Sequence, residues 1–389
     1  MTSLDYFAQE KLKKISEEGK LRSLNSFVPE DAKYVLHEGK KLISFASNDY
    51  LGMASNELVK KAAKNAIDQY GVGAKSARLI CGNSDIYGEL EGNLAKYKNA
   101  ERAVVFGSGY LSAIGVIPAL VGRRDLVVAD KFIHSSLLDG IALSGAALKR
   151  YNHNDYEHCN QILERERKNY QNCLIISETI FSMDGDFGDI EKLSILSEKF
   201  SSWLLTDDAH GFGIVGSAEV SKNIKDSYIQ LGTLSKAIGS YGGYIAASND
   251  ICNYIITKAK SFIYTTALPH PVIAAANKAV EIIREDKTII EKLKNNISLF
   301  ASQLQKTGQE GKMLTKEQDA YRTNKKSPIF IVEMDSIEEL NKCHQKLIDG
   351  GFYAGRIRPP TSKTPRLRIT ISATHEEQEI KKLCFLLVR

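Results

Sequence analysis

The sequence lacks several features that mark specialised classes of protein. Its six cysteines are far apart, with no CxxC pair and no metal-ligand spacing to histidine. We therefore expect reduced, mostly buried thiols and no bound metal. The net charge is only +5, and lysine and arginine form no block of the kind that binds nucleic acid. A nucleic-acid partner is therefore not expected.

Signals for export or membrane insertion are also missing. The first twenty residues are charged and amphipathic, without the apolar run of a signal peptide, so we expect a cytoplasmic protein. One uncharged stretch, 103–122, has the length of a transmembrane helix. It contains four glycines, two serines and Pro118. A buried strand at 103–106, a Gly-Ser-Gly turn and a packed helix fit it better than a membrane span.

Short apolar runs alternate along the chain with segments of helical length. The runs bounded by polar residues predict strands buried on both faces, at 126–129, 173–177 and 203–206. The segments between them predict helices at 134–145, 155–168 and 190–200. This order is typical of an α/β domain with a mostly parallel sheet.

The pattern changes after about residue 268. A long helical region reaches about residue 310 with breaks, and a polar segment follows near 308–327. The rest predicts a compact α+β unit, with a strand at 329–332, a helix near 336–349, a strand ending near Ile371 and a last helix from about His375. We expect an N-terminal segment (1–44), a large domain (45–285) and a smaller C-terminal domain (286–389).

Chemistry-bearing residues follow the predicted strands of the large domain. They lie at 107–110, 130–134, 178–184 and 207–210. Because ligands gather at the carboxyl ends of parallel strands, we expect these loops to meet at one edge of the sheet. No GxGxxG motif follows the first strand, which argues against a dinucleotide site.

The segment 232–239, which contains Lys236, predicts a pyridoxal phosphate (PLP) site when it is combined with Asp207. PLP chemistry requires a lysine amine for a Schiff base with the aldehyde and a carboxylate that keeps the pyridine nitrogen protonated. A hydroxyl such as that of Thr233 suits the phosphate. Taken alone, Lys236 would be one solvated lysine among many.

Three other candidates each have two interpretations. The 107–109 turn offers N–H groups to a phosphate, but such turns are common. His134 either stacks on an aromatic cofactor or serves as a helix cap or a hydrogen-bonding residue of the core. Arg366 and Arg368 alternate on a strand, where they form a solvated edge or bind a carboxylate.

The motifs together resemble the α-oxoamine synthases, a branch of the fold-type I PLP-dependent transferases, and within them the oxononanoate synthases of biotin synthesis. The resemblance runs nearly end to end. It rests on motifs at 47–52, 107–110, 129–134, 181–186, 207–211, 232–236 and 357–370.

This resemblance implies a role for each matching position. Lys236 would hold the cofactor, Asp207 would pair with the pyridine nitrogen, and His134 would stack on the ring and donate a proton to the thioester oxygen. The remaining cofactor contacts would come from Gly109, Tyr110, Ser182, His210, Thr233 and Thr265 or Thr266, the last reaching the neighbouring subunit of a homodimer. The substrate site would contain Arg22, Thr361 and Arg368, of which Arg368 would bind the amino-acid carboxylate.

The implied reaction is a decarboxylative condensation of L-alanine with pimeloyl-CoA or a pimeloyl carrier protein. Two alternatives remain. A sister enzyme would use glycine or serine with another acyl thioester, as 2-amino-3-ketobutyrate CoA ligase does. A non-catalytic relative would have lost the lysine or the aspartate, and both are present.

The sequence departs from the family pattern between residues 71 and 87. Relatives often carry a Gly/Ser-rich loop where Ala74, Lys75 and Ala77 stand, and histidines where Ser84 and Tyr87 stand. We expect this region to contact the acyl substrate. Lys75 is either a surface lysine or a partner for an anionic group of the acyl donor.

Overall fold

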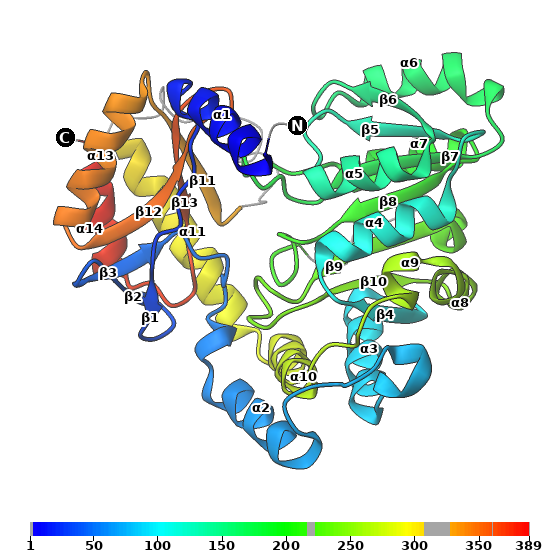
Figure 1. The fold of residues 1–389 in the computed structure, drawn as a ribbon, viewed down its shortest axis with the longest axis horizontal. Helices are drawn as coiled ribbons and strands as arrows, with labels where there is room; N and C mark the ends of the chain where they lie inside the picture. The colour runs from blue at the N-terminus through cyan, green and yellow to red at the C-terminus, as the bar shows by residue number, and fades with distance from the viewer. Residues whose placement is uncertain (1–2, 216–221, 307–326, 360, 389) are drawn as a thin grey trace.

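The computed structural model describes residues 3–215, 222–306, 327–359 and 361–388. These residues form two β-sheets, each covered by helices, and Figure 1 shows them as two units with α2 (Glu57–Tyr70) and α10 (His270–Glu285) at the bottom of the view. The expected polar segment near 308–327 lies almost wholly outside the described residues.

The larger unit is built on a seven-stranded sheet with the order β4-β10-β9-β8-β7-β5-β6. Within it only β10 runs opposite to its neighbours, so the expected mostly parallel sheet is confirmed. The strands are β4 (Arg102–Phe106), β5 (Leu126–Asp130), β6 (Ala147–Tyr151), β7 (Cys173–Glu178), β8 (Trp203–Asp207), β9 (Tyr228–Thr233) and β10 (Gly243–Ala247).

Helices bury both faces of this sheet, as the uninterrupted apolar runs predicted. In β5, Val127 and Ala129 pack in one cluster and Leu126 and Val128 in another, because alternate side chains point to opposite faces. The first cluster includes α4 (Gly109–Leu120), α5 (Ser135–Ser144), α8 (Asn249–Lys258) and α9 (Lys260–Ile263); the second includes α6 (Tyr156–Glu166) and α7 (Ile190–Lys199).

The uncharged stretch 103–122 forms β4, a turn and α4, as expected. Ser108 caps α4 by accepting a hydrogen bond from the Leu111 amide at 3.1 Å. Within the described ranges no helix has the length and apolar character needed to cross a bilayer.

The smaller unit contains a six-stranded sheet with the order β1-β2-β3-β12-β13-β11. Its strands are β1 (Val28–Pro29), β2 (Tyr34–His37), β3 (Lys40–Phe45), β11 (Ile329–Glu333), β12 (Phe352–Ile357) and β13 (Arg366–Thr370). Its helices are α11 (Thr288–Lys306), α13 (Ile337–Asp349) and α14 (Glu377–Val388).

The N-terminal strands belong to this smaller sheet. β3 pairs in parallel with β12, with Ile43 opposite Phe352, and the expected division of the chain had kept 1–44 apart from 286–389. Local sequence patterns do not reveal a strand partner three hundred residues away. α1 (Leu4–Glu17), which precedes these strands, buries none of its side chains.

Candidate active site

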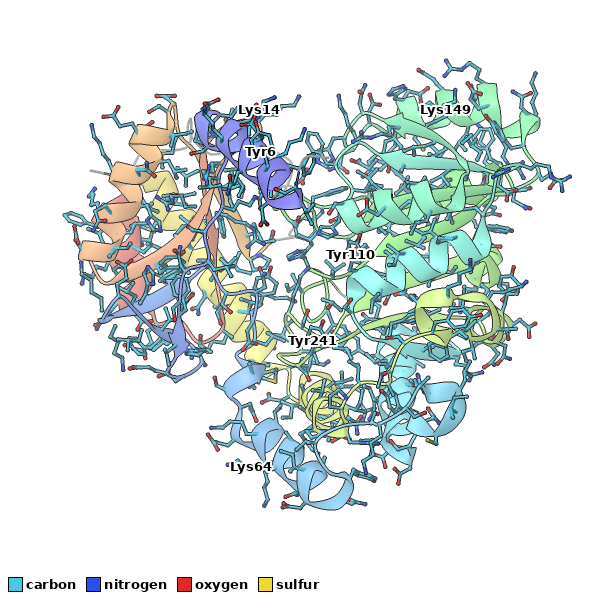
Figure 2. The ribbon with its side chains drawn as sticks, in the orientation of Figure 1. Tyr6, Lys14, Lys64, Tyr110, Lys149 and Tyr241 are labelled. Atoms are coloured by element: carbon cyan, nitrogen blue, oxygen red, sulfur yellow. The ribbon has the colours of Figure 1, made fainter. Side chains whose placement is uncertain are left out.

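Five loops of the larger unit reach one edge of its sheet. They follow β4, β5, β7, β8 and β9, which run in the same direction and therefore end at the same edge. Contacts between these loops, described below, join most of the predicted site residues. Figure 2 shows Tyr110, at the start of α4, on the side of the larger unit that faces the smaller one.

Lys236 lies at the centre of this edge, in the loop after β9. Its Nζ is 2.8 Å from His210 Nε2. Burial lowers the pKa of the Lys236 amine, although Asp207 and Glu178 act in the opposite direction. A lysine with a lowered pKa is neutral more often than a solvated one, which suits a nucleophilic amine.

His210 connects Lys236 to the smaller unit. Its other ring nitrogen, Nδ1, lies 2.7 Å from the Tyr50 hydroxyl, and that hydroxyl donates to Asn48 Oδ1 at 3.2 Å. Burial holds the pKa of His210 well below its usual range, so the ring is neutral. Because Tyr50 donates its proton to Asn48, the Tyr50 oxygen accepts from Nδ1–H, and Nε2 accepts from Lys236.

Two buried carboxylates stand beside Lys236 on neighbouring strands. Asp207 ends β8 and lies in register with Glu178 of β7. Asp207 accepts a hydrogen bond from the Ala209 amide at 2.8 Å, and burial raises its pKa while Lys236 opposes this shift. Burial and the negative charge of Asp207 raise the pKa of Glu178 well above its usual range, while the His134 amide and Lys236 oppose this shift.

His134 caps the helix that follows β5. Its Nδ1 accepts from the Ser136 amide at 3.2 Å and lies 2.8 Å from the Ser136 hydroxyl, and its own amide donates to Glu178 at 2.5 Å. The capping interpretation is therefore confirmed. Since Nδ1 accepts, Nε2 carries the proton, and the side chain is exposed at the sheet edge.

Gly109, Tyr110 and Thr233 lie together at the start of α4. A Cβ atom placed on Gly109 would lie 3.4 Å from the Thr233 side chain, which shows that the two residues are neighbours. The Thr233 hydroxyl donates to the Gly242 carbonyl at 2.9 Å and lies 2.8 Å from the Ser235 hydroxyl. A helix N-terminus flanked by hydroxyl groups suits a phosphate.

The solvated-edge interpretation of Arg366 and Arg368 is wrong. β13 lies between β12 and β11, and the two side chains are only 8% and 9% exposed. Both reach the loop after β7 in the larger unit. Arg368 donates to the Ser182 carbonyl at 2.8 Å and to Asn48 at 3.1 Å, and Arg366 donates to the Met183 carbonyl at 3.1 Å.

Arg22 and Thr361 meet at the surface of the smaller unit. The Arg22 guanidinium donates to the Thr361 hydroxyl at 3.0 Å, although 339 positions separate them. Arg358 donates to the carbonyls of Gly19 and Leu21 and so holds the segment that precedes Arg22. Across the described part of the chain, neither Arg22 nor Thr361 hydrogen-bonds to the residues around Lys236.

The region that departs from the family pattern is partly buried. Tyr87 is fully buried, and its hydroxyl donates to the Leu268 carbonyl at 3.2 Å. Contrary to our expectation for this region, the Tyr87 side chain does not face a substrate. Lys75 is exposed and has a φ of +64°, a conformation that favours glycine. Thr266 pairs with Ala77 of this loop through a β-bridge and has an exposed side chain.

Sequence analysis missed His153, which joins three of the strand ends. Its Nδ1 lies 2.9 Å from Asp130 after β5, and its Nε2 lies 2.7 Å from Asp186 in the loop after β7. The ring also stacks on Phe132 at 4.5 Å. Burial opposes the charged ring, but the bonds to the two carboxylates raise the pKa of His153 to about 10. A histidine between two distant carboxylates has no local sequence signal.

Replacing His153 with glutamine should therefore destabilise the protein in a pH-dependent way. The folded-state pKa of about 10 exceeds the ordinary value of 6.5, so the charged ring contributes stability fully below about pH 6.5. That contribution is lost as pH rises toward 10. We expect a loss on the order of 3 kcal/mol at pH 6 and a much smaller loss near pH 10, measured by urea unfolding.

His158→Gln is the matched control for this experiment, because the His158 ring accepts a hydrogen bond from the Asn152 amide at 3.1 Å. We expect this variant to lose about 1 kcal/mol at pH 6, the contribution of one hydrogen bond. An equal loss at pH 6 and pH 10 for His153→Gln would show that the ring is not held as a cation.

Comparisons with known proteins agree with this geometry. The model of the aminotransferase class I and II family matches residues 40–386. The 8-amino-7-oxononanoate synthase of Beijerinckia indica is 36% identical over 389 residues, covering 98% of this chain and 97% of that protein. The similarity therefore extends over nearly the whole length of both proteins.

Solved structures show the same fold. Serine palmitoyltransferase from S. paucimobilis, with a bound PLP-myriocin aldimine, superposes with a TM-score of 0.88 at 25% identity and covers 100% of this chain and 98% of its own. The 8-amino-7-oxononanoate synthase from Francisella tularensis gives a TM-score of 0.74 at 26% identity, covering 89% and 97%.

The sheet, the buried lysine and the aspartate beside it define a fold-type I enzyme of the aminotransferase class I and II family. Two 8-amino-7-oxononanoate synthases that are 36% identical to this chain over nearly its full length narrow the assignment further. The chain belongs to the α-oxoamine synthases of that family, on the side of the 8-amino-7-oxononanoate synthases.

Proposed function

We propose that this protein condenses L-alanine with a pimeloyl thioester, carried by coenzyme A or a carrier protein, to give 8-amino-7-oxononanoate, CO2 and the free thiol. The reaction is a step of biotin synthesis and uses PLP. The observation that carries the proposal is Lys236, whose partly buried amine lies 2.8 Å from the His210 ring and interacts electrostatically with Asp207. The proposal places the enzyme in the cytoplasm.

The residues at the sheet edge fit PLP. The α4 N-terminus with Gly109, Tyr110 and Thr233 would hold the phosphate, and Asp207 would face the pyridine nitrogen. Ser182 and the exposed ring of His134 would complete the contacts. When bound, PLP supplies an aldehyde for an amine and an electron sink for the charge that forms at the amino-acid Cα.

Each side chain then has a definite task. Lys236 would attach the cofactor, and its amine, whose pKa is lowered by burial, would take the proton from the Cα of alanine. Arg368 binds the alanine carboxylate, because its guanidinium is fixed by Ser182 and Asn48 at the junction of the two units. His134, with its proton on Nε2, donates toward the thioester oxygen.

The enzyme works as a homodimer in this proposal. Large apolar side chains stand exposed on the loop after α2 and beside α9, with Val72, Ile80 and Tyr264 each at least 76% exposed. The bridge between Ala77 and Thr266 joins these two segments into one surface. Burying that surface against a second copy would bring Thr265 or Thr266 to the partner's phosphate.

A crossed panel of substrates tests the function. L-Alanine, glycine and L-serine are each combined with pimeloyl, acetyl and palmitoyl thioesters, and CO2 release and amino ketone are measured. We expect the highest kcat/KM for L-alanine with a pimeloyl thioester. A tenfold higher value for glycine or serine with another thioester would favour a sister enzyme, the alternative that the similarity to serine palmitoyltransferase supports.

A further inference from the structure

A buried ion pair lies directly behind the site. Lys98, in the last turn of α3 (Asp85–Lys98), places its Nζ 2.8 Å from Asp208 Oδ2. The Lys98 and Asp208 side chains are only 2% and 1% exposed. Burying an ion pair so completely costs desolvation free energy, and removing one partner leaves an uncompensated charge. A buried pair at Asp208 therefore affects both the charge around the neighbouring Asp207 and the geometry of the loop that carries it.

Asp208 is the residue after Asp207, and it organises the loop that carries the site. Its second oxygen, Oδ1, accepts from the Thr179 hydroxyl at 2.8 Å, and its amide donates to the Leu231 carbonyl at 2.7 Å. Its carbonyl accepts from the Gly211 amide at 3.0 Å. A Cβ on Gly211 would lie 2.1 Å from Asp208 Oδ1, so the loop closes tightly around this carboxylate.

The end of α3 holds the same loop at further points. The Tyr97 hydroxyl accepts from the Gly213 amide at 3.1 Å, and its ring stacks on Phe212 at 4.2 Å. The Lys98 carbonyl also accepts from the Gln230 side chain of the neighbouring strand β9 at 3.0 Å. Two consecutive residues of one helix therefore fix the loop between Asp207 and Gly213, Lys98 through Asp208 and Tyr97 through Gly213.

We propose that Lys98 is a positioning residue for the reaction. It holds the loop that presents Asp207 and His210 to the cofactor, and it balances the second negative charge of the Asp207–Asp208 pair. The inference rests on the proposed function, since it assigns Lys98 to the PLP site. Neither role requires Lys98 to touch substrate or cofactor.

The charge balance has a direct consequence for Asp207. The negative charge of Asp208 already contributes to raising the pKa of Asp207. Without the Lys98 ammonium, the negative charge of Asp208 would be uncompensated and would raise the pKa of Asp207 further. A larger fraction of Asp207 would then be protonated at a given pH, which weakens its interaction with a protonated pyridine nitrogen.

Lys98→Met tests the proposal, because methionine keeps most of the side-chain length without the charge. Wild type and variant are stripped of PLP and titrated with it, and kcat, KM for L-alanine and the pH profile of kcat are measured. We expect PLP to bind at least tenfold more weakly, kcat to fall at least tenfold with a smaller change in KM, and the acid limb of the profile to move to higher pH.

Two further variants complete the design. Lys96→Met, an exposed lysine in the same turn, should stay within twofold of wild type in every measurement. Lys98→Met combined with Asp208→Asn leaves no buried charge unpaired, so it should fold even if Lys98→Met does not. It still lacks the anchor between α3 and the loop, so its PLP affinity and kcat should remain at least fivefold lower than in wild type.

Lys98 is not a positioning residue if the folded single or double variant matches wild type within twofold in PLP affinity and kcat and shows the same acid limb in its pH profile of kcat. A wild-type protein that bound no PLP would instead refute the proposed function, and the positioning role with it. A wild type that binds PLP but prefers other substrates would change only the substrate assignment. The PLP titration of Lys98→Met would still measure whether Lys98 positions the loop for PLP binding.

Discussion

Replacing Lys236 with alanine should lower kcat on the order of 10⁴-fold, the largest effect of any single substitution in this protein. The substitution removes both the amine that attaches PLP and the group that takes the Cα proton. His210 and Asp207 keep their other contacts, with Tyr50 and the Ala209 amide. The variant should therefore fold normally and still bind PLP without a covalent bond.

Borohydride reduction followed by peptide mapping provides the direct measurement. In wild type the cofactor should be fixed on Lys236, and in Lys236→Ala no lysine should carry it. Lys258→Ala, an exposed lysine at the end of α8, is the control and should retain wild-type activity and labelling. Label on any other lysine of the wild-type protein would refute the assignment of Lys236.

Asp207→Asn should lower kcat at least a hundredfold while the fold is retained. Asparagine has the same shape, and its oxygen still accepts from the Ala209 amide at the Oδ1 position, 2.8 Å away. What it lacks is the negative charge that keeps a pyridine nitrogen protonated. Turnover equal to that of wild type would show that the charge of Asp207 is not needed for the cofactor to act as an electron sink.

Glu178→Gln is a matched control for the loss of a carboxylate, because Glu178 lies in register with Asp207 on the neighbouring strand. Burial and the charge of Asp207 raise the pKa of Glu178 well above its usual range, which favours its neutral form, and glutamine retains the oxygen that accepts from the His134 amide. We expect kcat within about threefold of wild type, since the amide keeps this hydrogen bond. The contrast between the two isosteric changes measures the charge of Asp207 alone.

Much of the larger unit could be predicted from the sequence because its signals are local. Uninterrupted apolar runs indicated strands buried on both faces, and the helices between them were predicted within a few residues, as for α7 (Ile190–Lys199) against 190–200. The position of Lys236 after one strand and Asp207 after another also follows from the chain order. Parallel strands bring such loops to one edge without further information.

The burial of side chains was harder to predict. Arg366 and Arg368 have the alternation of a solvated edge strand, yet β11 and β12 cover β13 on both sides and leave both arginines buried against the larger unit. Tyr87 is buried by helices and strands that lie far from it in the sequence, and its hydroxyl donates to the Leu268 carbonyl. Alternation shows which side chains share a face, but it does not show what covers that face.

The sequence by itself determined the order of the elements, the chemistry of the lysine, aspartate and histidine motifs, and the family to which they point. The tertiary structure alone decided which distant groups meet: β3 with β12, His153 with Asp130 and Asp186, and Lys98 with Asp208. The reason is physical. Periodicity and residue type are properties of neighbouring positions, whereas the charge state of a buried group depends on partners that only packing brings within hydrogen-bond distance. Lys236 is therefore recognisable in the sequence, but its lowered pKa is a property of the fold.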